Sequence, residues 1–217
     1  MFETLTAAPP DKILNLSVLF RADARPDKMD LGVGVYKDSS GATVIMKAVR
    51  EAEKRLYDSQ TTKTYLGMGG DDGFNKAMLK LVFGEDADFS RLFSGQTAGG
   101  TGALRTLAEL INKARPGVTV WLSDPTWANH APILKAAGLK TAAYPYFDAA
   151  TGKVKFDEMV AALKAVPAGD VVLLHGCCHN PTGANLTLDQ WAVVGDLMVE
   201  RRLFPFVDLA DQGFGDG

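Results

Sequence analysis

A glycine-rich stretch before a helical pattern is the first place where the sequence could do chemistry. In "TAGGTGALR", residues 97–105, Gly99, Gly100 and Thr101 precede apolar residues spaced as on one helix face. Free backbone N–H groups and the helix dipole at such a turn attract anions, and the threonine hydroxyl can add a bond. The stretch predicts a phosphate site, and the alternative is a turn that only needs glycine dihedrals. The dinucleotide fingerprint G-x-G-x-x-G is not met, which disfavours a dinucleotide-dependent oxidoreductase.

A tryptophan and a histidine follow an apolar run in "SDPTWANH", residues 123–130. Pro125 ends the run and places Trp127 in a loop, where its indole could stack on a flat ring or simply pack. His130 could orient a buried carboxylate or cap the helix that follows. This stretch therefore predicts an aromatic stacking face for a ligand.

The stretch "HGCCHNPTG", residues 175–183, combines two histidines, two cysteines and an asparagine. It suggests a metal site at first, but the adjacent Cys177 and Cys178 cannot easily chelate one zinc ion, and no second pair has the usual spacing. We therefore predict no metal. The two cysteines also lie too close for ordinary disulfide geometry, which predicts reduced thiols. Asn180 before Pro181 predicts an extended residue whose amide can donate to a fixed acceptor, unless the motif is only a turn.

A carboxylate, Asp208, ends the apolar run at residues 204–207. Burying a carboxylate costs several kcal/mol unless a cation or hydrogen-bond donors meet it. No lysine or arginine lies within five residues of Asp208. We therefore expect a positive partner from elsewhere, the alternative being an exposed acid just beyond the strand.

The segments around these four stretches predict an α/β fold with a mostly parallel sheet and crossover helices. Short apolar runs alternate with helical patterns. The runs occupy 118–123, 139–146, 170–176 and 204–210, and the helical patterns occupy 102–113, 128–137, 156–166 and 188–202. In such sheets ligands bind beyond the carboxyl ends of the strands, so we expect the four stretches to converge. Upstream, the pattern predicts helices near 11–20, from 43, and at 74–82.

Composition narrows the class of protein. The 217 residues are 47% hydrophobic, with 23 basic and 26 acidic side chains and a formal charge of −3. These values fit a globular chain and disfavour nucleic acid and membrane partners. The amino terminus lacks a charged-then-apolar signal pattern, and reduced thiols fit a cytoplasmic location.

Together, the four stretches would offer an anion site, an aromatic stacking face, an amide donor and a carboxylate. Pyridoxal phosphate matches this set, because it has a phosphate, a flat ring, a phenolic oxygen and a protonatable ring nitrogen. From about Asp11 onward, the chain also resembles the class I aminotransferases of the aspartate and aromatic amino acid type. The stretches that carry the resemblance are "LGVGVYKDSSG" (31–41), "TYLGMGG" (64–70), "GGTGALR" (99–105), "DPTWANH" (124–130), "HGCCHNPTG" (175–183) and "QGFGDG" (212–217).

The resemblance implies pyridoxal phosphate transferase fold type I, incomplete at the carboxyl terminus, with residues 1–40 as an arm and part of a small domain and 41–217 as the large cofactor-binding domain. It implies that Gly99, Gly100 and Thr101 hold the phosphate, while Tyr65 reaches the phosphate of the neighbouring subunit in a homodimer. Trp127 would stack on the pyridine ring, Asn180 would donate to the phenolic oxygen, and Asp208, supported by His130, would pair with the ring nitrogen. Gly34, Trp127 and Asn180 would face the substrates, an aspartate or aromatic amino acid and a 2-oxo acid.

Two departures from the family pattern concern activity. Asp211 stands where the family typically has a tyrosine that bonds the phenolic oxygen, so a carboxylate there would repel that oxygen. The Schiff-base lysine and the arginine that binds the substrate carboxylate match no residue of the 217. We therefore expect a fragment that does not transaminate alone, and a noncatalytic cofactor-binding or dimerisation remnant is the alternative.

Overall fold

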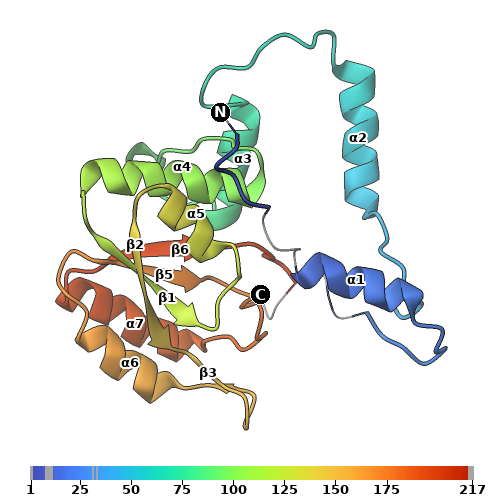
Figure 1. The fold of residues 1–217 in the computed structure, drawn as a ribbon. Helices are drawn as coiled ribbons and strands as arrows, with labels where there is room; N and C mark the ends of the chain where they lie inside the picture. The colour runs from blue at the N-terminus through green and yellow to red at the C-terminus, as the bar shows by residue number, and fades with distance from the viewer. Residues whose placement is uncertain (1, 8–11, 31, 33, 215–217) are drawn as a thin grey trace. The chain divides into compact units, whose positions relative to one another are not determined.

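The computed structural model describes residues 2–7, 12–30, 32 and 34–214 (Figure 1). The chain divides into two compact units, Met1–Tyr65 and Leu66–Gly217. The first unit carries the helices α1 (Lys12–Ala22) and α2 (Lys47–Ser59), and α2 has no buried residue. Asp11, where the first helix was expected to begin, and residues 215–217 of the last matched stretch lie outside the described residues. The division expected near residue 40 stays a prediction.

The second unit is built on a parallel sheet, as the sequence predicted. Its strands are β1 (Thr119–Asp124), β2 (Lys140–Pro145), β5 (Val171–His175) and β6 (Phe204–Asp208), in the order β2-β1-β5-β6. All three neighbouring pairs run parallel. The helices are α3 (Asp72–Phe83), α4 (Gly99–Ala114), α5 (His130–Ala136), α6 (Phe156–Lys164) and α7 (Leu188–Glu200).

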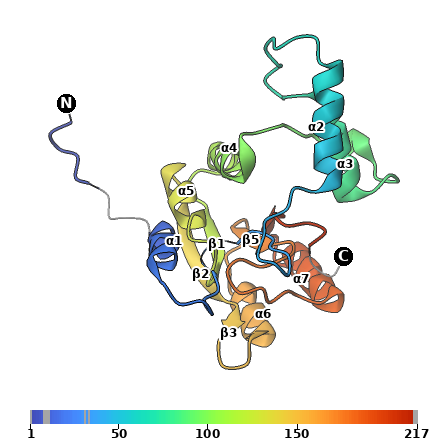
Figure 2. The ribbon, with the colours of Figure 1, turned by 90° about the vertical axis from the view of Figure 1, so that its right-hand side faces the viewer.

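Alternating side chains of the strands build a core on each face of the sheet. In β5, Val171 and Leu173 join Leu104 of α4 and Leu134 of α5 in one buried cluster. The intervening Val172 and Leu174 join buried residues of α6 and α7 in the other. Because successive strand side chains point to opposite faces, a run that is apolar at every position fits a strand covered on both sides. Figures 1 and 2 show α4 and α5 on one side of the sheet and α6 and α7 on the other.

The helix α7 begins with a capping box formed by Thr187 and Gln190. The Thr187 hydroxyl accepts from the Gln190 N–H at 3.2 Å, and the Gln190 side chain accepts from the Thr187 N–H at 3.0 Å. These reciprocal bonds satisfy backbone donors that the first turn leaves without helical partners. Val194 and Met198 are buried, so the helix is fixed at its start and along one face.

Three short elements were not predicted from the sequence. The strands β3 (Phe147–Asp148) and β4 (Lys153–Val154) form an antiparallel hairpin, and the 3-10 helix η1 spans Phe89–Arg91. Elements of two or three residues carry too little periodicity to be recognised. Among the helices of the described residues, none has both the length and the apolar character needed to cross a membrane.

A carboxylate fastens the amino ends of three strands. Asp170, just before β5, accepts from the Trp121 indole N–H at 2.9 Å and from the Thr119 N–H at 3.2 Å. Its carbonyl oxygen accepts from the Phe204 N–H at 2.9 Å. Asp170 therefore links β1, β5 and β6 at the end of the sheet away from the predicted site.

Candidate functional site

All four stretches meet at one cavity of about 230 Å³. It lies where α4 begins and where β5 and β6 end. Its lining includes Gly100 from the first stretch, Trp127 from the second, Asn180 from the third and Asp208 from the fourth. Parallel strands bring their carboxyl ends to the same edge, which is why residues far apart in the sequence become neighbours here.

Asp208 is held by a buried histidine. Its Oδ2 lies 2.9 Å from Nε2 of His130, whose side chain is fully buried, while Asp208 itself is 24% exposed. His130 is the first residue of α5 and packs edge to face against Trp127, with the ring centroids 5.3 Å apart. The hydrogen bond from His130 holds the pKa of Asp208 below its usual value, although desolvation opposes the shift. Asp208 is therefore kept ionised at the rim of the cavity.

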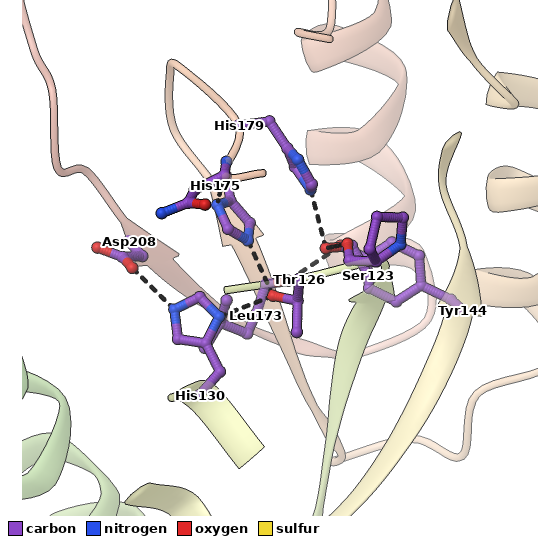
Figure 3. A network of polar contacts seen from close by, with 10 residues as sticks. Ser123, Thr126, His130, Tyr144, Leu173, His175, His179 and Asp208 are labelled. Carbon is purple, nitrogen blue, oxygen red and sulfur yellow. Dashed lines mark hydrogen bonds and ion pairs between the residues drawn. The ribbon is translucent and has the colours of Figure 1, made fainter. Parts of the chain in front are cut away.

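A line of polar contacts extends from His130 away from Asp208 (Figure 3). The Thr126 hydroxyl lies 2.7 Å from Nδ1 of His130 and 3.1 Å from Nε2 of His175. At the far end, the Asn180 N–H donates to Nδ1 of His175 at 3.4 Å. The contacts join loops and strand ends from three of the four stretches.

The Asn180 backbone N–H determines which group donates and which accepts in each of these hydrogen bonds. Because Nδ1 of His175 accepts from Asn180, the proton of a neutral His175 is on Nε2 and is donated to Thr126. The Thr126 hydroxyl can then donate a hydrogen bond to Nδ1 of His130. Nε2 of His130 in turn donates to Asp208. Burial, with a smaller contribution from His130, lowers the pKa of His175 to about 4, consistent with a neutral ring. This arrangement points a donor at Asp208.

His179 lies behind His175 and is also held as a neutral ring. Its Nε2 contacts the Ser123 hydroxyl and its Nδ1 contacts the Thr182 hydroxyl, both at 2.9 Å. Its ring stacks on Tyr146 and lies against His175, with centroids 4.0 and 4.1 Å away. Burial, followed by the effect of His175, lowers the pKa of His179 to about 3. Among the described residues, no group of three or more His, Cys, Asp or Glu side chains could hold a metal ion.

The start of α4 offers backbone donors. Its N-cap, Ala98, has no side-chain hydrogen bond to the first turn, and Gly99, Gly100 and Thr101 are all exposed there. Gly99 has a φ of +66°, a conformation that glycine adopts without strain, and a Cβ on Gly99 or Gly100 would meet no atom within 4 Å. This 16-residue helix therefore presents its positive end beside the cavity.

Thr126 and Gly176 belong to the site, but the sequence reasoning did not single them out. Thr126 was detectable in principle, because it lies only four residues before His130 and a turn before the helix could bring its hydroxyl to the imidazole. Gly176 allows β6 to approach the end of β5: its N–H donates to the Asp208 carbonyl at 2.8 Å, and a Cβ there would lie 2.6 Å from the Leu209 side chain and 3.2 Å from Val207. No local pattern announces such a close approach.

Six residues to which the sequence analysis assigned a role are not part of the cavity lining. Gly99 and Thr101 flank Gly100, which lines the cavity, and His130 contacts the lining residues Trp127 and Asp208. Gly34 and Tyr65 belong to the first unit, where both are exposed, and their predicted roles stay predictions. Asp211 is also exposed, and its carbonyl accepts from the Phe214 N–H at 3.1 Å and from the Cys178 thiol at 3.6 Å. Because water screens an exposed charge, the Asp211 carboxylate would repel the phenolic oxygen of the cofactor less strongly than a buried carboxylate would.

Comparison with known proteins identifies close relatives. Residues 26–217 match the family model described as aminotransferase class I and II. The chain is 52% identical over 217 residues to an aromatic-amino-acid aminotransferase of Paracoccus denitrificans, covering all of this chain and 55% of that protein. It is 46% identical over 220 residues to an aspartate aminotransferase of Escherichia coli, covering all of this chain and 56% of that protein. The chain thus spans about half the length of these curated relatives.

Solved structures agree with this relationship. A crystal structure of an aromatic amino acid aminotransferase from Burkholderia cenocepacia superposes with a TM-score of 0.95 at 46% identity, covering all of this chain and 55% of that one. An aromatic-amino-acid aminotransferase from Burkholderia pseudomallei, described as covalently bound to pyridoxal phosphate, superposes with a TM-score of 0.95 at 42% identity and the same two coverages. The parallel-sheet fold is therefore that of these enzymes over the part that aligns.

Proposed function

The chain belongs to the class I and II aminotransferases, and from this premise we propose that it binds pyridoxal phosphate for the transfer of an amino group between an amino acid and a 2-oxo acid. The observation that carries the proposal is the shared cavity. It joins the uncapped start of α4 to Trp127 and to an ionised Asp208 that is held by a buried histidine.

The residues present fit the chemistry of this cofactor. At the start of α4, Gly100 and Thr101 offer backbone N–H groups and the Thr101 side chain offers a hydroxyl to a phosphate, whereas the Gly99 N–H donates to the Thr97 carbonyl at 2.9 Å. Within the described chain, His130 is the hydrogen-bond partner of the Asp208 carboxylate, and it contacts only Oδ2. The other oxygen, Oδ1, remains able to accept from a protonated ring nitrogen. Trp127 and Asn180 line the same cavity and supply a stacking surface and an amide donor.

When bound, pyridoxal phosphate supplies an electron-accepting ring that takes up charge as the bond to the substrate's α-proton breaks. Asp208 would keep the proton on the ring nitrogen by its negative charge. His130 would orient Asp208, and the Thr126 and His175 contacts would keep a donor of His130 directed at the carboxylate. Trp127 and Leu104 would exclude water from one side of the ring.

Substrate and assembly belong to the same proposal. Two relatives are named for aromatic amino acids and for aspartate, so one of these substrate classes is proposed for the whole protein. Gly34 is proposed to face the substrate, and Tyr65, which is 99% exposed, to reach the phosphate of a second subunit in a homodimer. A cytoplasmic location is proposed with them.

One observation favours a second candidate, reversible cofactor binding without transamination by these 217 residues. No lysine is among the residues that line the cavity in the described part of the chain. Covalent attachment of the cofactor needs an amine within reach. The chain alone would then act as a cofactor-binding or dimerisation module.

Titration of the 217-residue chain with pyridoxal phosphate tests both candidates. The visible absorbance of the cofactor reports binding, and borohydride treatment followed by intact-mass measurement reports covalent attachment to a lysine. A shifted, saturable spectrum without a borohydride-stable adduct supports the reversible module, and an adduct at one lysine supports the enzyme. An unchanged spectrum at millimolar cofactor would contradict both.

A further inference from the structure

Two neighbouring thiols lie in the wall of the cofactor cavity. Cys177 and Cys178 are both free and partly exposed, and both line the cavity together with Trp127 and Asp208. In an extended chain, neighbouring side chains point to opposite sides. Here Cys178 has a φ of +45°, which breaks that alternation. Both cysteines can therefore border one space.

The two thiols also interact with each other. Burial, the Cys178 thiol and the Asp211 carboxylate raise the pKa of the Cys177 thiol. The Cys178 Sγ donates to the Asp211 carbonyl at 3.6 Å. This raised pKa keeps the Cys177 thiol mostly protonated near neutral pH.

The surroundings restrict what such a pair can bind. Zinc requires about four ligands, and the described residues offer no group of three or more metal-binding side chains. A ligand that needs only two sulfur atoms and brings its own third substituent meets this restriction. Monosubstituted trivalent arsenicals have that valence, because arsenic carries one carbon group and forms two bonds to sulfur.

We propose that Cys177 and Cys178 form a dithiol site for monosubstituted trivalent arsenicals in the wall of the cofactor cavity. With phenylarsine oxide, two S–H bonds break and two As–S bonds form, and the oxide oxygen leaves as water with both protons. Arsenic stays trivalent, so no oxidant or reductant is required.

Because the two thiols lie in the wall of the cofactor cavity, an arsenical bound to them should affect cofactor binding. The cavity measures about 230 Å³, and a phenylarsenic group held by its wall would occupy the space beside Trp127 and Asp208. Capture of the arsenical and binding of pyridoxal phosphate should therefore exclude each other. This part of the inference rests on the proposed function, whereas capture by the two thiols does not.

The test treats the 217-residue chain with phenylarsine oxide and measures intact mass and free thiols. We expect one phenylarsenic group per chain with loss of both thiols, reversal by a small 1,2-dithiol, and resistance to a monothiol. The variants Cys177→Ser and Cys178→Ser keep the side-chain shape and lose the second As–S bond, so their affinity should fall by about 100-fold or more because the intramolecular bond is lost. Two groups per chain, or a serine variant that binds like the parent, would overturn the proposal.

A second measurement separates this inference from the proposed function. Saturating pyridoxal phosphate should slow arsenical capture in the folded chain, and it should give no protection in denaturing urea, where the thiols remain adjacent but the cavity is lost. Prior capture should abolish the cofactor's spectral change. If untreated chain shows no spectral change, the proposed function fails while dithiol capture still stands. If cofactor binds equally well to chain that carries the arsenical, the placement of this site in the cofactor cavity is wrong.

Discussion

The two ends of the parallel sheet each carry a half-buried aspartate, and the two are satisfied differently. At the amino end, Asp170 uses both carboxylate oxygens, one on the Thr119 N–H and one on the Trp121 indole. At the carboxyl end, Asp208 uses Oδ2 on His130 and borders a cavity. One carboxylate is saturated by its own chain, and the other keeps bonding capacity for something else.

This difference separates a structural carboxylate from a functional one. A buried carboxylate that the fold needs for itself should have its acceptors filled by donors of the chain, as Asp170 does. A carboxylate intended for a ligand must instead be held in place through one oxygen while the other stays available. His130, Thr126 and His175 do this for Asp208 without neutralising it with a lysine or arginine.

The largest expected effect concerns the carboxyl end. Asp208→Asn keeps an oxygen that can accept from His130 but removes the charge. We expect pyridoxal phosphate affinity to fall by about 100-fold, or about 2.8 kcal/mol, because a protonated ring nitrogen loses its anionic partner. The absorbance titration measures this. Asp196→Asn, which neutralises an exposed carboxylate on α7, serves as the control and should bind like the parent. Equal affinity of the Asp208 variant would remove the distinction between the two aspartates.

The next effect concerns the amino end. Asp170→Ala leaves the Thr119 N–H and the Trp121 indole N–H without their acceptor, and we expect the free energy of unfolding to fall by about 2 kcal/mol. Urea unfolding followed by circular dichroism gives the value. Cofactor affinity of the folded fraction should stay within about twofold of the parent. A variant of unchanged stability but weakened cofactor binding would contradict the structural assignment of Asp170.

Lower pH should reduce the stability of the folded chain through two histidines at the carboxyl end of the sheet. His175 and His179 have pKa values lowered to about 4 and about 3, so between pH 6.5 and about 4 the unfolded chain binds protons that the folded chain refuses. Stability is therefore full above pH 6.5 and falls as the pH drops through this window, by about 1 kcal/mol once solvent screening is allowed for. Asp208, whose pKa is lowered, adds its own loss only at more acidic pH.

Urea midpoints measured at several pH values check this expectation, with His175→Gln as the comparison. The glutamine side chain cannot take up the proton, so the dependence between pH 6.5 and about 4 should be shallower in that variant. An identical slope in parent and variant would show that His175 titrates normally in the folded chain.

The smallest expected effect concerns Asp211. Asp211→Asn removes a negative charge from the neighbourhood of the cavity, and Asp211→Tyr adds a phenol that can donate to the cofactor. Because Asp211 is exposed, its repulsion is worth at most about 1 kcal/mol, so we expect affinity to rise by up to about fivefold. The tyrosine variant should gain at least as much as the asparagine variant. Equal or weaker binding by both would show that the carboxylate does not face the cofactor.

Much of the second unit was predictable because its signals are local. The buried runs of β5 and β6, the stripe of α7 and its Thr187–Gln190 box follow from periodicity and capping within a few residues. The expectation that strand ends meet follows from the rule for parallel sheets, and it placed Trp127, Asn180 and Asp208 at one cavity. The hairpin of β3 and β4 escaped because its strands have two residues each.

By itself, the sequence determined which residue types stand at the strand ends and that Asp208 needs a partner. Tertiary structure decided who that partner is: not a nearby cation, but His130, 78 positions away, supported by Thr126 and His175. It also showed that Gly176 permits the approach of β6 and that the two thiols share the cavity. Propensity and periodicity act over one or two turns of chain, whereas the direction of a hydrogen bond and the satisfaction of a buried charge depend on groups that only folding brings within about 3 Å.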